Sequence, residues 1–293
     1  METRWSDDRL AQALARLCAH LVVALVALVG IGGATRVMEA GLACPDWPLC
    51  YGSLLPGGRM NMQVFLEWFH RLDAFVVGMA LLVLCAVSVF QRHRLPPWLP
   101  WLSGGALALV AIQGGLGALT VLALLPSAVV TAHLTVALLL VALISATSQQ
   151  LLDRGNAPLP SLSRVWLLLA TVALVAVLAQ CLLGGSMATQ WAAERCLSSG
   201  QGCAWLSAHR HGGSIAAAAV LLQAASAPLL RLRGVALGLS LAAGALVLTQ
   251  LALGLTSWHL QLQAPLITVA HQVVAALLVA VLTAGLSREM AHG

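Results

Sequence analysis

Eight long apolar segments constrain this chain more than any other feature. Each has about 20 residues, the length that an α-helix needs to cross the hydrocarbon core of a bilayer. Only 9% of the residues are charged, against about 25% in soluble proteins. The sequence therefore predicts an all-α integral membrane protein with eight transmembrane helices. The predicted spans are residues 17–38, 64–90, 101–122, 127–151, 165–187, 209–230, 235–257 and 265–286.

The positions of the arginines predict the topology. All 15 basic residues are arginines, and basic residues collect on the cytoplasmic side of membrane proteins. With the N-terminus in the cytoplasm, ten of the 15 lie on that side and both termini are cytoplasmic. The arginines lie at the ends of spans and form no single basic face. The net charge of +5 therefore does not indicate nucleic-acid binding.

The chain also repeats itself. His70 recurs as His209, 139 residues later, and His133 recurs as His271, 138 residues later. Four spans per repeat give both halves the same orientation, so the prediction is two tandem four-helix bundles related by a pseudo-twofold axis. The predicted parts are a cytoplasmic N-terminal segment (1–16), an N-terminal bundle (17–151), a cytoplasmic linker (152–164), a C-terminal bundle (165–286) and a cytoplasmic tail (287–293).

The four repeated histidines lie near the outer ends of the predicted spans. His70 and His209 begin spans, and His133 and His271 lie about one turn inside two others. Each half thus offers two imidazoles at similar depth on two helices, which suits axial ligation of one heme iron inside a four-helix bundle. The hypothesis is two hemes, one per half. A di-iron site is disfavoured because it needs several more glutamates.

Glycines and arginines near the histidines have two interpretations each. The glycines leave room for a flat macrocycle or for close helix packing, which small residues favour in lipid. Arg36, Arg71 and Arg210 are candidate partners of heme propionates, since a guanidinium binds a carboxylate through two N–H groups. The alternative is that they extend to the membrane surface. The glycines are Gly32, Gly33, Gly114, Gly115, Gly117, Gly184, Gly185 and Gly254.

The halves differ in one carboxylate. Glu67 lies three residues before His70, whereas the matching residue of the second half is Leu206. A carboxylate kept near the membrane is costly, so it is a functional candidate. The alternative is a simple ion pair with Arg71, one helical turn away. The prediction is that the first half carries out chemistry on its ligand and the second holds a redox cofactor, with Asp73 a candidate partner of His70.

Four cysteines lie in outer loops. Cys44 and Cys50 are in the first loop, and Cys196 and Cys203 are in the third. The outer side is oxidising, so the pairs Cys44–Cys50 and Cys196–Cys203 are predicted to form disulfides. A redox-active or copper-handling role of the first pair is the alternative.

Several motifs together resemble the heme A synthase family, in its bacterial form with cysteine pairs in the outer loops. The resemblance covers the chain from about residue 21 to residue 286, and the motif of the first loop is highly specific. The motifs are GGATR (32–36), GLACPDWPLCYG (41–52), EWFHR (67–71), QGGLGALTV (113–121) and the two later histidines.

The resemblance implies a protein of the bacterial inner membrane whose heme sites face the periplasm. It implies heme b on His209 and His271, and heme O, with its product heme A, on His70 and His133. The implied reaction oxidises the C8 methyl group of heme O to a formyl group by two hydroxylations, with oxygen from water. Glu67 is the implied catalytic residue.

The implied partners are the lipid bilayer, heme O synthase and the cytochrome oxidase assembly machinery, and a homo-oligomer is left open. The extra His211 beside His209 leaves two candidate ligands, of which the matched spacing favours His209. Two other functions also fit four histidines. A diheme b-type cytochrome would transfer electrons without modifying a heme, and an assembly subunit would only relay heme. Glu67 and the long first loop argue against the cytochrome.

Overall fold

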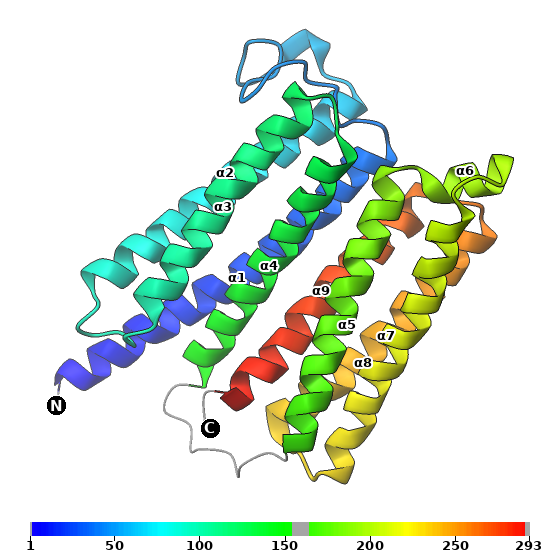
Figure 1. Cartoon of the computed structure of the whole chain (residues 1–293). Coiled ribbons are helices and arrows are strands. Elements are labelled where there is room, and N and C mark those ends of the chain that lie inside the picture. Colours follow the sequence, from blue (N-terminus) through cyan, green and yellow to red (C-terminus); the bar gives the residue numbers. More distant parts are fainter. Residues whose placement is uncertain (1, 154–163, 291–293) are drawn as a thin grey trace.

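The computed structural model describes residues 2–153 and 164–290, and the helices of this part form a long bundle (Figure 1). Among the described residues, eight helices are long and apolar enough to cross a membrane. The predicted all-α membrane fold with eight spans is confirmed. The helices are α1 (Glu2–Val37), η1 (Gly57–Arg59), α2 (Met62–Phe90), α3 (Leu99–Leu122), α4 (Ser127–Leu152), α5 (Arg164–Thr189), α6 (Ala192–Ser199), α7 (Cys203–Leu229), α8 (Gly234–His259) and α9 (Pro265–Met290).

The eight long helices form two rings of four. In the first ring, α1 packs on α2, α2 on α3, α3 on α4, and α4 closes back on α1. In the second ring, α5, α7, α8 and α9 follow one another in the same way, and α9 closes on α5. The two rings stand side by side in Figure 1. Each ring encloses a core in which side chains from opposite helices can meet.

Helices α1, α4, α5 and α9 join the rings, because α4 and α1 pack on α9, and α4 also packs on α5. Two glycines predicted to be near a heme allow this contact. A methyl group on Gly33 would lie 1.9 Å from Oε1 of Gln272, and one on Gly185 would lie 2.8 Å from Leu134. For these two glycines the helix-packing interpretation therefore applies.

The same turn ends the third helix of each ring. Leu125 has a φ of 59° and Leu262 a φ of 63°, the left-handed conformation that stops a helix. The N–H of Leu125 donates to the oxygen of Thr120 at 2.7 Å, and that of Leu262 donates to Ser257 at 3.0 Å. The repeat seen in the sequence thus extends to the backbone of the turns.

Some boundaries differ from those predicted. Helix α1 begins at Glu2 and α7 begins at Cys203, whereas the predicted spans begin at residues 17 and 209. Hydropathy detects only the apolar part of a helix and misses polar turns that continue it. The short α6 in the third loop was not predicted. Of the predicted linker and tail, residues 154–163 and 291–293 lie outside the described residues.

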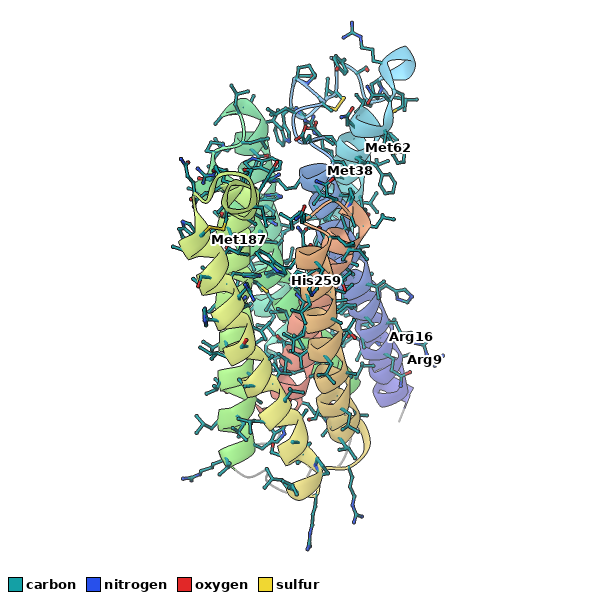
Figure 2. The ribbon with its side chains drawn as sticks, turned by 90° about the vertical axis from the view of Figure 1, so that its right-hand side faces the viewer. Arg9, Arg16, Met38, Met62, Met187 and His259 are labelled. Carbon is teal, nitrogen blue, oxygen red and sulfur yellow. A yellow bond between two sulfur atoms is a disulfide. The ribbon has the colours of Figure 1, made fainter. Side chains whose placement is uncertain are left out.

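The two ends of the bundle can be told apart in Figure 2. Arg9 and Arg16 extend from α1 near the end where that helix begins, and Met38 and Met62 lie near the opposite end, which carries the loop between α1 and α2 (Figure 2). We call the second end the loop end. At the loop end Asn61 caps α2, and its Oδ1 accepts the N–H of Val64 at 2.9 Å. This cap fixes where the helix that carries Glu67 begins.

Candidate functional site

A large cavity opens inside the two rings toward the loop end. Its volume is about 2190 Å³, and residues of both halves line it, including all four repeated histidines. Pockets for drug-sized ligands have about 300–1,000 Å³. The cavity therefore has room for more than one large ligand.

The structure brings the histidines together in the pairs that the sequence predicts. The ring centres of His70 on α2 and His133 on α4 are 6.4 Å apart. Those of His209 on α7 and His271 on α9 are 6.5 Å apart. Two imidazoles on opposite sides of one metal, each with a metal–nitrogen bond of about 2 Å, have ring centres about 6 Å apart. Both pairs therefore have the spacing of axial ligands.

Each imidazole rests against a glycine of a neighbouring helix. A methyl group on that glycine would lie 2.8–3.6 Å from Cε1 of the ring, and at three of the four glycines it would press against the imidazole. Four of the glycines predicted to make room for a macrocycle therefore make room for its candidate ligands. The distances are 3.0 Å for Gly32 to His70, 3.6 Å for Gly117 to His133, 2.8 Å for Gly184 to His209 and 3.1 Å for Gly254 to His271.

The donor set fits an iron that brings most of its own ligands. Within residues 2–153 and 164–290, no group of three or more His, Cys, Asp or Glu side chains could hold a metal ion. Two imidazoles alone do not complete the coordination of a bare transition-metal ion. A porphyrin supplies the remaining nitrogens, so each pair fits heme iron better than a free metal.

Two glutamines contact the second imidazole pair. The amide nitrogen of Gln180 lies 2.8 Å from Nδ1 of His209, and that of Gln250 lies 3.2 Å from Nε2 of His271. The role of Gln180 is not evident from the sequence alone. The available signal was a polar side chain in the middle of an otherwise apolar span.

The structure separates His209 from the neighbouring His211. The ring of His211 is exposed, and its Nδ1 lies 2.7 Å from the main-chain oxygen of Ser207 in the same helix. His209 faces His271 across the ring of helices. The matched spacing in the sequence had favoured the same histidine.

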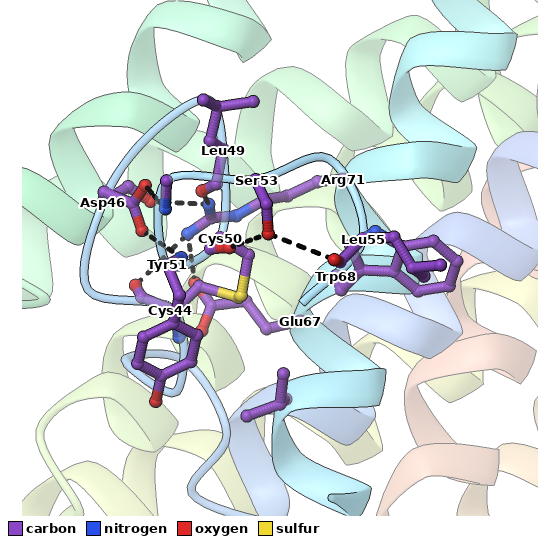
Figure 3. The surroundings of a disulfide bond; sticks show 12 residues. Cys44, Asp46, Leu49, Cys50, Tyr51, Ser53, Leu55, Glu67, Trp68 and Arg71 are labelled. Carbon is purple, nitrogen blue, oxygen red and sulfur yellow. Dashed lines mark hydrogen bonds and ion pairs between the residues drawn. A yellow bond between two sulfur atoms is a disulfide. The ribbon is translucent and has the colours of Figure 1, made fainter. Parts of the chain in front are cut away.

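Glu67 is buried, with 5% of its surface exposed, and it lines the cavity one helical turn before His70. Its Oε2 accepts the main-chain N–H of Cys44 at 2.7 Å, and its Oε1 is paired with Arg71 (Figure 3). The matching Leu206 is also buried, with 8% exposed. The carboxylate is therefore both the residue beside the first imidazole pair and an anchor of the first loop.

Arg71 holds the first loop onto α2. Its Nη1 donates to the main-chain oxygens of Asp46, at 2.6 Å, and of Leu49 (Figure 3). Its Nη2 donates to Glu67, and the oxygen of Cys44 lies 3.4 Å away. Both terminal nitrogens thus have protein partners. A contact of Arg71 with a heme propionate stays a prediction.

The first loop is closed by further bonds. Both predicted disulfides, Cys44–Cys50 and Cys196–Cys203, are present. The Asp46 carboxylate accepts the N–H groups of Gly52 at 2.8 Å and Tyr51 at 2.6 Å. These bonds, with the one from Gly52 having the largest effect, lower the pKa of Asp46 below its usual range.

The other two candidate propionate partners stack on tryptophans. The guanidinium of Arg210 lies 5.0 Å from the ring centre of Trp258 and is exposed. That of Arg36 lies 3.5 Å from the ring centre of Trp191 and donates to the main-chain oxygen of Ala188. Arg36 therefore links α1 to the end of α5 and so joins the two rings.

Asp73 does not serve as the partner of His70. Nδ1 of His70 is buried and has no hydrogen-bond partner among the described residues. The same holds for Nδ1 of His133 and of His271.

The amino-acid sequence of this chain is similar to those of heme A synthases. That of Shewanella oneidensis is 32% identical over 197 residues, which are 60% of this chain and 57% of that protein. That of Chelativorans sp. is 29% identical over 208 residues, which are 57% and 55%. The chain thus spans little more than half the length of these relatives. A stretch of 78 residues is 33% identical to the protoheme IX farnesyltransferase of Haloarcula marismortui, covering 27% of this chain and 16% of that protein.

A family profile matches far more of the chain. The COX15-CtaA profile, described as cytochrome oxidase assembly protein, matches residues 15–283. The match contains Glu67, both loop disulfides and all four repeated histidines. This chain, from its first span to its last, belongs to the COX15-CtaA family of cytochrome oxidase assembly proteins.

Proposed function

We propose that the protein is a heme A synthase, an oxidoreductase that converts the C8 methyl group of heme O to the formyl group of heme A. The observation that carries the proposal is that both imidazole pairs have the spacing of axial ligands and that, in the described part of the chain, only the first pair has a buried carboxylate beside it. The names of the relatives support the same activity.

The two halves would have different tasks. His70 and His133 hold the heme that is oxidised, because Glu67 lines the cavity on their side. His209 and His271 hold heme b, which supplies a one-electron redox centre when bound. The walls of the cavity are mostly apolar, so charges inside it interact more strongly than they would in water.

The reaction needs a carboxylate close to the methyl group. Conversion of a methyl to a formyl group takes oxygen from water and releases protons and electrons, so a proton acceptor is required. Glu67 accepts a proton from the attacking water or stabilises positive charge that develops at the methyl carbon. Its bonds to Arg71 and to the N–H of Cys44 hold the carboxylate in one orientation. The electrons leave to an acceptor outside the chain.

The proposal is tested by replacing Glu67 in cells supplied with heme O and identifying the extracted hemes. We expect Glu67→Gln to retain bound heme and to lower heme A formation about 100-fold or more, since general acid–base groups contribute about 10²–10⁴-fold. Glutamine still offers an oxygen to the N–H of Cys44, so the loop stays attached.

The control is Asn61→Ala, which weakens the start of the same helix without touching the cavity. This variant should form heme A normally. Normal heme A yield from Glu67→Gln would remove Glu67 from the mechanism. Heme B as the only product of the unmodified protein would exclude the synthase activity itself.

The setting of the protein follows from the same proposal. Both termini would be cytoplasmic and the loop end would face the periplasm of the inner membrane, because most arginines lie at the other end. The enzyme that makes heme O must supply the substrate. The similarity of one stretch to a protoheme IX farnesyltransferase supports a link to that enzyme.

A further inference from the structure

The two imidazole pairs differ in the hydrogen bonding of Nδ1 on their first histidine, His209 or His70. In the C-terminal half, the amide of Gln180 lies 2.8 Å from Nδ1 of His209 and also donates to the main-chain oxygen of that residue at 2.7 Å. In the N-terminal half, Nδ1 of the equivalent His70 is buried and has no hydrogen-bond partner within residues 2–153 and 164–290. One ligand is therefore tied to a neighbouring helix and the other is not.

The sequence repeat identifies the residue that replaces this amide in the first half. Gly32 and Gly184, which contact the equivalent histidines, are 152 residues apart, and the same offset relates Gln180 to Leu28. Leu28 lines the cavity as Gln180 does. A leucine has no group that can bond to an imidazole nitrogen.

Two glycines on α7 make the space for the amide. A methyl group on Gly212 would lie 2.5 Å from Oε1 of Gln180, and one on Gly213 would lie 3.3 Å from its Nε2. The matching residues of α2, 139 positions earlier, are Asp73 and Ala74. The second half thus has Gln180 and two glycines that leave space for its carboxamide, whereas the first half has Leu28, Asp73 and Ala74 at the matching positions.

We propose that Gln180 is a positioning residue that fixes His209 and thereby retains heme b in the C-terminal half, whereas the free ring of His70 lets the N-terminal half exchange its heme. This inference rests on the proposed function, which assigns the resident cofactor to the second half. A cofactor must stay bound through many turnovers, whereas a substrate must enter and its product must leave.

The physical basis is the bond at the ring nitrogen that does not face the metal. Such a bond fixes the plane of the imidazole and makes it a stronger ligand. When Nε2 binds iron, Nδ1 carries the ring proton, and a half turn of the carboxamide lets its oxygen accept that proton in place of the N–H that donates to the main-chain oxygen of His209. The stronger ligand favours the oxidised iron, so loss of the bond raises the reduction potential.

The test uses the full chain carrying His70→Ala and His133→Ala, so that bound heme belongs to the second half. We expect Gln180→Leu, added to this background, to speed the transfer of heme to excess apomyoglobin about tenfold or more, since loss of such partners weakens metal sites about 10–100-fold. The midpoint potential of the heme should become more positive.

A second variant tests the same contact without removing the amide. Gly212→Ala places a methyl group against Oε1 of Gln180 and favours the helix, since alanine is the better helix former. It should also speed heme transfer. The matched control is Gln223→Leu, which removes a buried amide of α7 that donates to Ser240 at 3.0 Å. This control should leave the transfer rate and the potential unchanged.

The outcomes separate the two proposals. If the background protein binds heme but both Gln180→Leu and Gly212→Ala match it in transfer rate and potential, Gln180 has no positioning role, and the proposed function stands. If Gln223→Leu has the same effect as Gln180→Leu, the change reflects general loosening and the inference is wrong. A background protein without heme would overturn the assignment of heme b to this half, and the inference with it.

Discussion

At the scale of single residues, the site depends on small groups placed beside large ones. Each of the four repeated imidazoles has a glycine at its Cε1 edge, and the closest approach is at Gly184, where a methyl group would lie 2.8 Å from His209. At Gly117 the corresponding distance to His133 is 3.6 Å, an ordinary contact. The four glycines therefore differ in how little space they leave for a side chain.

This difference gives a prediction for alanine substitutions. Gly184→Ala should displace the ring of His209 and lower the heme content of the second half, because the methyl group overlaps the imidazole. Gly117→Ala should leave heme content unchanged. Heme per protein, measured in extracts of the purified variants, checks both. Equal heme content in the two variants would show that the imidazoles adjust freely to their neighbours.

Glu67 and Arg71 also act at this scale, and they combine both interpretations that the sequence left open. The ion pair between them is present, and the carboxylate in addition accepts the N–H of Cys44 and borders the cavity. A structural bond and a chemical role therefore do not exclude each other here. The loop disulfide and the candidate catalytic carboxylate form one hydrogen-bonded unit.

At the scale of the elements, a buried ion pair joins the ends of α4 and α9 opposite the loop end. Arg288 lies 2.7 Å from Asp153, and their side chains are only 10% and 4% exposed. Gln149 donates to the second carboxylate oxygen at 2.8 Å. The pair closes the contact between the two halves away from the cavity.

Removal of one partner should destabilise the bundle strongly. Asp153→Ala leaves a buried guanidinium without its carboxylate, which costs about 3–5 kcal/mol, whereas replacing both residues by apolar ones is often nearly neutral. We expect a large drop in melting temperature in detergent for Asp153→Ala and a smaller one for the double variant Asp153→Leu with Arg288→Met. Replacement of the exposed Arg233 by alanine is the control. An unchanged melting temperature for Asp153→Ala would contradict the assigned role of the pair.

At the scale of the whole molecule, the duplication gives two similar rings around one shared cavity. Both halves have a histidine pair, glycines beside its imidazoles, and the same turn at the end of the third helix, α3 or α8. They differ at Glu67 against Leu206 and at Leu28 against Gln180. Glu67 lies one helical turn from His70 and Gln180 contacts His209, so under the proposed function one fold would hold a reacting heme and a resident one.

The proposed orientation predicts which loops can be labelled from outside the cell. A cysteine in place of Arg59, exposed in the loop between α1 and α2, should react with a membrane-impermeant maleimide in intact cells. A cysteine in place of the exposed Arg233, between α7 and α8, should react only after the membrane is opened. The reverse pattern would invert the topology and place the heme sites on the cytoplasmic side.

The sequence alone was sufficient for the spans, the repeat, the histidine pairs and the disulfides. Hydropathy over about 20 residues reports burial in lipid directly, and the nearly equal spacing, 63 residues from His70 to His133 and 62 from His209 to His271, reflects the internal repeat. The specific loop motif also led to the family. These features depend on local composition or on an internal comparison of the chain with itself.

Only the tertiary structure decided which groups touch the histidines and Glu67. The contacts of Glu67 with Cys44, of Gln180 with His209 and of Gly33 with Gln272 join helices or loops that are far apart in the chain. Hydropathy treats all positions around a lipid-embedded helix alike, so it does not show which face meets a partner. The packing of the two rings selects those faces, and with them the difference between the two imidazole pairs.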